Sequence, residues 1–264
     1  QANAANAGAT LFMRGEWIEE GADGKIYWTE TGRDDAGAKF ASTTGAFPKT
    51  AVAQHHVDRG YTDNTYNDYY GRVLVFDPTD NSIKSFLEGG DGTTTNDDLH
   101  LSNPDGMTFI KIKDKNFMII QEDLNGTNQG RIPSYAKNGA VCEMFLLEMT
   151  GQASADVDDL LRIAVMPVGA EVTGARASSD GSTIFFNVQH PFSGAGAYAK
   201  AYENTKDHDG DAIGTGNDAY AKKMGVYPFN HSMTCAIYNL DNFVFVAMEE
   251  PQFDPNKAFD IYPN

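Results

Sequence analysis

The chain has 264 residues, and its acidic side chains outnumber the basic ones by 37 to 20, which gives a formal net charge of −17. A field of this sign repels phosphate backbones and argues against a nucleic-acid partner, whereas it suits a protein that collects hard cations such as Ca²⁺ on carboxylates. Hydrophobic residues make up 41% of the chain, so a core can form, but every apolar run is far shorter than the ~18 residues that a membrane-spanning helix needs.

Short runs rich in β-branched and aromatic residues, bounded by Gly, Asp or Asn, recur along the chain. Such runs are typical of antiparallel β-sheet. The predicted strands are 25–29, 72–76, 117–120, 141–147, 183–188, 233–238 and 243–246. Helical periodicity is rare, and the best candidate is a short helix at 153–163. The sequence therefore predicts an all-β fold.

Three segments repeat the same order of a polar turn between two strands: 22–28, 112–119 and 178–185. Hairpins of this kind build the blades of a β-propeller. The segments lie roughly 70 to 90 residues apart, more than the ~40–50 of compact blade repeats, so long insertions must separate the strands. The expected insertions, which could bind something or simply decorate the surface, are 31–68, 91–101 and 193–227.

These repeats predict about three blades, near 11–90, 104–168 and 171–248. We expect residues 1–264 to be one β-propeller domain or a portion of one. Because propellers close with roughly four to eight blades, another chain or a removed fragment of the same precursor is expected to complete the ring. The alternative is that the insertions add strands and close a small ring alone.

A distinctive motif begins at Gly169-Ala170-Glu171-Val-Thr-Gly, continues with an Asp180-Gly181 turn and ends, after a strand, in Gln189-His-Pro. This run resembles the PhoX-type alkaline phosphatase family. Two upstream segments resemble the same family. They are Asn-Pro-Asp-Gly at 103–106 with Gln-Glu-Asp at 121–123, and the opening Phe-Met-Arg-Gly-Glu-Trp at 12–17. The resemblance covers residues 10–35 and 70–192.

The resemblance implies that this chain belongs to a propeller of about six blades that carries calcium and iron at its centre and hydrolyses phosphate monoesters outside the cytoplasm. It implies that Glu16, Glu122 and Glu171 are metal ligands and that Asp105 and Asp123 are additional or supporting ligands. Arg176 is the expected contact to the phosphate of the substrate.

The chemistry of these residues agrees with the resemblance. Acidic residues at strand ends of different blades can meet at a central channel, where like charges are costly unless a cation neutralises them. Oxygen ligands select Ca²⁺ and, with added charge, Fe³⁺. Such metals would bind the phosphate and activate the attacking oxygen.

Two departures from the family pattern support a second hypothesis. Catalytic members often carry a basic residue in the loop where this chain has Val168, and the cysteine that binds iron in the family has no counterpart here. The alternative function is a non-catalytic, calcium-stabilised propeller that serves as a binding or assembly subunit.

Other candidates are less specific. Asp207 to Asp218 is spaced like a calcium loop, although a solvated acidic loop explains it as well. His55 and His56 with Asp58 could bind a metal, but adjacent histidines point opposite ways on a strand, which favours an exposed loop. Cys142 and Cys235 are either simply buried or joined in a disulfide.

Overall fold

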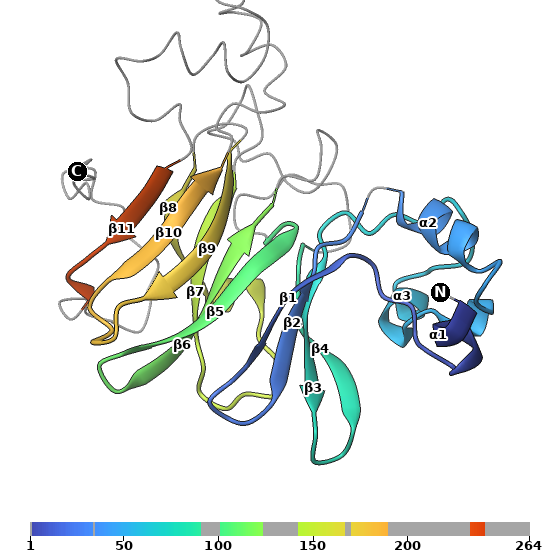
Figure 1. Ribbon diagram of the computed structural model, residues 1–264, viewed down its shortest axis with the longest axis horizontal. Helices are drawn as coiled ribbons and strands as arrows, with labels where there is room; N and C mark the ends of the chain where they lie inside the picture. Colours follow the sequence, from blue (N-terminus) through green and yellow to red (C-terminus); the bar gives the residue numbers. More distant parts are fainter. Residues whose placement is uncertain are drawn as a thin grey trace, which may run out of the picture.

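The computed structural model describes residues 2–33, 35–90, 101–123, 142–166, 170–189 and 233–240. These residues form three antiparallel sheets that stand side by side (Figure 1). The first sheet contains β1 (Gly15–Glu20), β2 (Ile26–Glu30), β3 (Arg72–Asp77) and β4 (Ser82–Glu88). The second contains β5 (Pro104–Ile112), β6 (Lys115–Glu122), β7 (Glu143–Glu148) and β8 (Leu160–Val165). The third contains β9 (Glu171–Ala177), β10 (Ile184–Gln189) and β11 (Met233–Ile237).

Within each sheet the strands follow one another in chain order, as the strands of a propeller blade do. The three repeated segments of the sequence are the β1–β2, β5–β6 and β9–β10 hairpins, which open successive sheets. The first strands also lie next to each other, since β5 contacts both β1 and β9. The predicted all-β, propeller-type fold is confirmed, and the described residues contain three blade-like sheets.

Short helices gather at one side of the first sheet: α1 (Ala2–Asn6), α2 (Ala36–Thr43), the 3₁₀ turn η1 (Lys49–Ala51) and α3 (Gln54–Asp58) (Figure 1). The insertion between β2 and β3 is thus partly helical. The expected helix at 153–163 is wrong. Only the 3₁₀ turn η2 (Val157–Asp159) is helical there, and the chain then enters β8. Pairing of β8 with β7 outweighs the weak helical period of this segment.

Two apolar layers join the sheets. The layer between the first and second sheets contains Tyr27, Val73, Phe86 and Met107 among others. The layer between the second and third includes Ile110, Phe117, Met144, Val172 and Ile184. Each fully buried large side chain stabilises the fold by about 1.5–3 kcal/mol, so these layers fix the relative positions of the sheets.

A smaller cluster, with Met13, Phe40 and Tyr61, packs beneath the helices. Cys142 is buried and Cys235 half-buried, and neither takes part in a disulfide. Among the described residues, no helix has the length and apolar character required to traverse a membrane.

Candidate functional site

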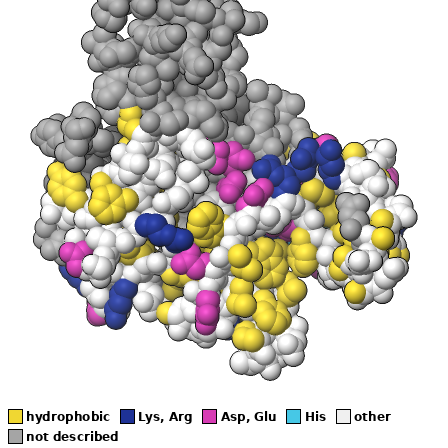
Figure 2. Space-filling model, viewed as in Figure 1, with side chains coloured by type: hydrophobic (Ala, Val, Ile, Leu, Met, Phe, Trp, Pro, Cys, Tyr) yellow, Lys and Arg dark blue, Asp and Glu magenta, His cyan; other side chains and the backbone are white. Residues whose placement is uncertain are grey.

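Four carboxylates from three sheets lie close enough to interact around Asp105. Burial first, and then the negative charges of Asp123, Glu16 and Glu171, raise the pKa of Asp105 to about 7, whereas the charge of Arg14 lowers it. Glu16 and Asp105 stand near the starts of β1 and β5, Glu171 is the first residue of β9, and Asp123 follows β6. The structure thus brings together four of the predicted metal-binding residues. Asp and Glu side chains gather beside Lys and Arg side chains near the upper centre of Figure 2.

The backbone is irregular at two of these carboxylates, Glu16 and Asp105, and this irregularity sets the direction of their side chains. The β1–β2 register shifts between Gly15 and Ile18, around Glu16, and the β5–β6 register shifts between Pro104 and Met107, around Asp105. A β-bulge bends its strand and redirects a side chain, which lets acidic residues of neighbouring sheets turn toward one place.

Asn103, whose φ is 51°, leads the chain into Asp105. Its side-chain amide donates to the carbonyl oxygens of Thr31 and Tyr69 at 2.9 and 3.0 Å. Its own carbonyl accepts from the N–H of Asp123 at 2.9 Å. The Asn-Pro-Asp turn is therefore anchored to the first sheet and holds Asp105 and Asp123 in one place.

The cation of this group is Arg14, which the sequence analysis did not select. Its Nη2 lies 3.3 Å from Oε1 of Glu16 and 3.4 Å from Oδ2 of Asp123. Arg14 has a φ of 53° and stands two residues before Glu16, directly ahead of β1. Its position in the Arg-Gly-Glu sequence beside a predicted ligand was the available signal.

Glu122 and Glu171 are held differently. Both oxygens of the buried Glu122 accept backbone N–H groups, from Ser102 at 2.7 Å and from Glu143 at 2.9 Å. Glu122 thus joins the strand ends beneath the group. Glu171 accepts from the side chain of Gln189 at 3.2 Å, so the two ends of the Glu-to-Gln motif contact each other.

Arg176 lies away from these carboxylates. Its Nη1 donates to Thr108 at 2.8 Å and pairs with Glu19 at 3.4 Å, and its guanidinium lies 5.5 Å from the ring centre of Trp17. Five residues of β-strand, roughly 16 Å, separate it from Glu171. The structure therefore places Arg176 at the other end of β9.

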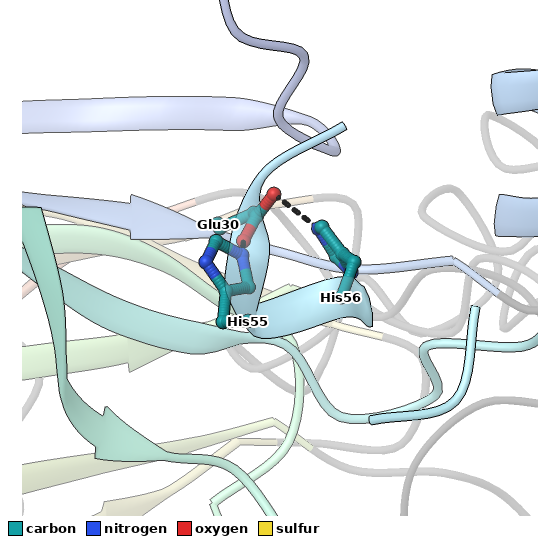
Figure 3. Close-up of side chains that lie close together, drawn as sticks. All are labelled: Glu30, His55 and His56. Atoms are coloured by element: carbon teal, nitrogen blue, oxygen red, sulfur yellow. Dashed lines mark hydrogen bonds and ion pairs between the residues drawn. The ribbon is translucent and has the colours of Figure 1, made fainter. Parts of the chain in front are cut away.

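A second cluster lies beneath the helices. His55 Nε2 is 2.7 Å from Oε2 of Glu30, and His56 Nε2 is 2.8 Å from Oε1 of the same carboxylate (Figure 3). Within the described part of the chain, this is the group of three or more His, Cys, Asp or Glu residues whose ligand atoms all lie within 4.8 Å of one another. The exposed-loop interpretation of the histidines is wrong, because they lie on α3 and His56 is buried. Asp58 instead accepts from Gln54.

Buried ion pairs surround this cluster. Arg72 donates to Glu30 at 2.7 Å, to both oxygens of Asp68 and to Glu88 at 3.0 Å. Burial alone would raise the pKa of Glu30, but hydrogen bonds from His55 and His56 and the charge of Arg72 hold it well below its usual value. Burial lowers the pKa of His56, which favours a neutral imidazole.

Some predicted features lie outside the described residues. They are Val168 and Gly169 of the motif, the His190-Pro191 pair, and the acidic loop from Asp207 to Asp218.

The three sheets are built as propeller blades, and acidic residues stand near the starts of their first strands. They define an all-β protein of propeller type with a candidate metal centre. The family model "Alkaline phosphatase PhoX" matches residues 1–192, and the chain belongs to this family. The chain is similar to a solved structure of Pseudomonas fluorescens PhoX in complex with vanadate, described as a transition-state analogue. The two share 22% identity with a TM-score of 0.47, and the match covers 72% of this chain and 31% of the other. The chain thus spans about a third of that protein's length. No curated protein sequence matches it significantly.

Proposed function

We propose that this chain provides part of the metal centre of a phosphomonoesterase of the PhoX type. The observation that carries the proposal is the electrostatic coupling of Asp105 to Asp123, Glu16, Glu171 and Arg14, which stand at neighbouring strand ends of three sheets. Family membership supports the reaction class.

The donor chemistry fits hard cations. Four carboxylates against Arg14 leave three excess negative charges if all are ionised. The high pKa of Asp105, caused first by burial and then by the neighbouring charges, shows that ionising this group without a metal is unfavourable. Carboxylate oxygens suit Ca²⁺ and, with added charge, Fe³⁺. We assign Glu16, Asp105, Asp123 and Glu171 as the ligands.

Glu122 has a supporting role in this proposal, because its oxygens fix the backbone under the site. The bound cations supply positive charge that polarises the phosphoryl group and stabilises the leaving oxygen. Arg14 orients the phosphate, since a guanidinium can donate two parallel hydrogen bonds to phosphate oxygens. Its side chain is 24% exposed and so remains accessible from the site.

One observation favours a second function. Because the carboxylates come from three different sheets, cations bound there would hold the sheets together whether or not a substrate turns over. The alternative is a calcium-stabilised propeller that serves as a binding or assembly subunit.

Hydrolysis of an aryl phosphate at alkaline pH tests the enzyme. We expect a chelator to abolish hydrolysis and Ca²⁺, with or without Fe³⁺, to restore it. Arg14→Ala should lower kcat/KM roughly 100-fold, because one charge-assisted donor to the transition state is lost. Arg176→Ala serves as the matched control and tests the assignment of the phosphate contact to Arg176. If the chain, loaded with both metals and assembled with the polypeptide that supplies the other blades, shows no turnover while Ca²⁺ raises its Tm, the alternative function holds.

We also propose that residues 1–264 are a portion of a propeller whose other blades come from another chain or from the same precursor. An extracytoplasmic location belongs to this proposal, since such proteins meet high calcium concentrations. A pull-down of the tagged protein from its native source, followed by mass spectrometry, identifies such a fragment.

A further inference from the structure

The cluster of Glu30, His55 and His56 shares no residue with the group around Asp105 and plays no part in the proposed phosphatase chemistry. The two histidines are consecutive on α3, yet both turn their Nε2 atoms to the same carboxylate of β2 (Figure 3). Their ring centres are 4.3 Å apart. Three ligand atoms from two elements thus converge on one point.

Glu30 is already oriented as a metal-binding carboxylate would be. Its Oε1 accepts from the N–H of Met13 and its Oε2 from Arg72, and each oxygen has one imidazole as its other partner. If a cation replaced the two imidazole donors, Met13 and Arg72 would keep the carboxylate in place. Such outer partners are a regular feature of metal sites in proteins.

The buried histidine has a partner for its second nitrogen. Nδ1 of His56 lies 3.1 Å from the hydroxyl oxygen of Tyr66. When the single proton of a neutral imidazole sits on Nδ1, it can be donated to Tyr66, and Nε2 offers its lone pair to a metal. The proton moves from one ring nitrogen of His56 to the other, so no charge is created and no other group has to accept a proton.

The surrounding charges leave room for a cation. The connected network holds three carboxylates, on Glu30, Asp68 and Glu88, and two guanidiniums, on Arg59 and Arg72. With neutral imidazoles, one negative charge is in excess. Glu30 and His56 are fully buried, whereas the side chain of His55 is 14% exposed and gives access from solvent.

We propose that Glu30, His55 and His56 form a binding site for one borderline divalent transition-metal ion of the Zn²⁺ type. Two imidazole nitrogens and one carboxylate oxygen are a known donor set for zinc, and imidazole distinguishes such a site from the oxygen-only group that suits calcium. The ion clamps α3 to β2 and so fixes the helical insertion on the first sheet.

Zn²⁺ and Co²⁺ are the probes for this site. The full chain is stripped with chelator, reloaded with Ca²⁺ and titrated with Zn²⁺ by calorimetry, while Co²⁺ is followed by its visible absorption. We expect one Zn²⁺ to bind per chain in addition to calcium. The visible spectrum should be that of a Co²⁺ ion of low coordination number. His55→Gln should weaken Zn²⁺ binding at least ~10-fold, because one ligand is lost. Asp58→Asn, on the same helix, should leave the affinity unchanged.

Two further variants keep the outcome decisive. His55→Cys replaces one zinc ligand by another and should restore binding, with a sulfur-to-cobalt charge-transfer band that packing alone could not produce. Glu171→Gln alters the group around Asp105 and should leave Zn²⁺ binding intact, so failure of the phosphatase proposal stays separate. Absence of saturable one-to-one binding to the unmodified chain, or equal affinity in His55→Gln, overturns the proposal and leaves a metal-free ion network.

Discussion

The carboxyl group of Asp105 shows how strongly surroundings can change one residue. Its pKa moves from the ordinary value of 3.8 to about 7, first because the group is buried and then because Asp123, Glu16 and Glu171 are negative. Between about pH 4 and pH 7 the native state therefore keeps a proton that the unfolded chain has lost. The contribution of Asp105 to the free energy of unfolding therefore falls as the pH rises through this window.

We expect Asp105→Asn to remove this pH dependence in the metal-free protein. One pKa unit corresponds to about 1.4 kcal/mol, and solvent screening reduces the full value, so the variant should gain about 1–2 kcal/mol at pH 8. Urea unfolding at pH 4 and pH 8 measures it. At pH 4 the two proteins should be nearly equal. In Ca²⁺ the order should reverse, because the variant lacks a ligand, and a gain that persists in Ca²⁺ would contradict the assignment.

At the scale of single residues, the sequence predicted the carboxylates of the candidate metal centre better than the residues that contact them. Acidic residues at strand ends were recognisable because the motifs that contain them resemble those of the PhoX family, and the strand ends of neighbouring blades can meet. Arg14 was missed because the neighbouring Glu16 in the sequence was the available signal, whereas the contact with the distant Asp123 depends on a left-handed turn that forms in the fold. Glu30 was missed because its histidine partners are 25 and 26 residues away and become its neighbours only when α3 folds over β2.

At the scale of elements, Arg72 connects β3 to the strands and the insertion around it. Its buried guanidinium pairs with Glu30 of β2, Glu88 of β4 and Asp68 of the insertion. Removing one partner of a buried ion network leaves uncompensated charge, which costs about 3–5 kcal/mol. We expect Arg72→Ala to lose that much stability in urea unfolding.

Lys84→Ala on the neighbouring strand is the control for Arg72→Ala, since Lys84 is exposed and its loss should change the stability by less than about 0.5 kcal/mol. Arg72→Lys keeps the charge but cannot pair with Asp68 through two nitrogens, so its stability should lie in between. Equal stability of Arg72→Ala and Lys84→Ala would show that the network does not hold the insertion.

The strands were predictable because alternating apolar residues and polar turns identify a hairpin locally. The helices of the insertion were not, because α2 has eight residues and α3 five, too few for a clear helical period. These helices depend on packing against Met13 and Tyr61 and on the ion pairs of Arg72, which are contacts between distant parts of the chain.

At the scale of the whole molecule, one face of the first sheet carries apolar side chains that the described residues leave exposed. Strand register places Ile18 and Trp28 on this face, together with Ile26, Phe76 and Ile83. Ile18 is 65% and Ile83 47% exposed. Figure 2 shows hydrophobic side chains gathered over this part of the surface. The other face packs on the second sheet through an apolar layer of the same kind.

A continuous apolar sheet face is costly in water, and a sheet packed as the second one packs would cover it. We therefore expect a further blade from another polypeptide to occupy this face. In the purified chain without such a partner, the faces of two copies should cover each other. Light scattering should then give a mass above the 28.7 kDa of one chain.

The double substitution Ile18→Lys with Ile83→Lys should restore a mass of 28.7 kDa without lowering the free energy of unfolding, because both side chains are exposed. Val57→Lys, an exposed apolar residue on α3, should leave the association unchanged. A single species of 28.7 kDa for the unmodified chain at high concentration, with no second polypeptide bound, would show that this face needs no partner.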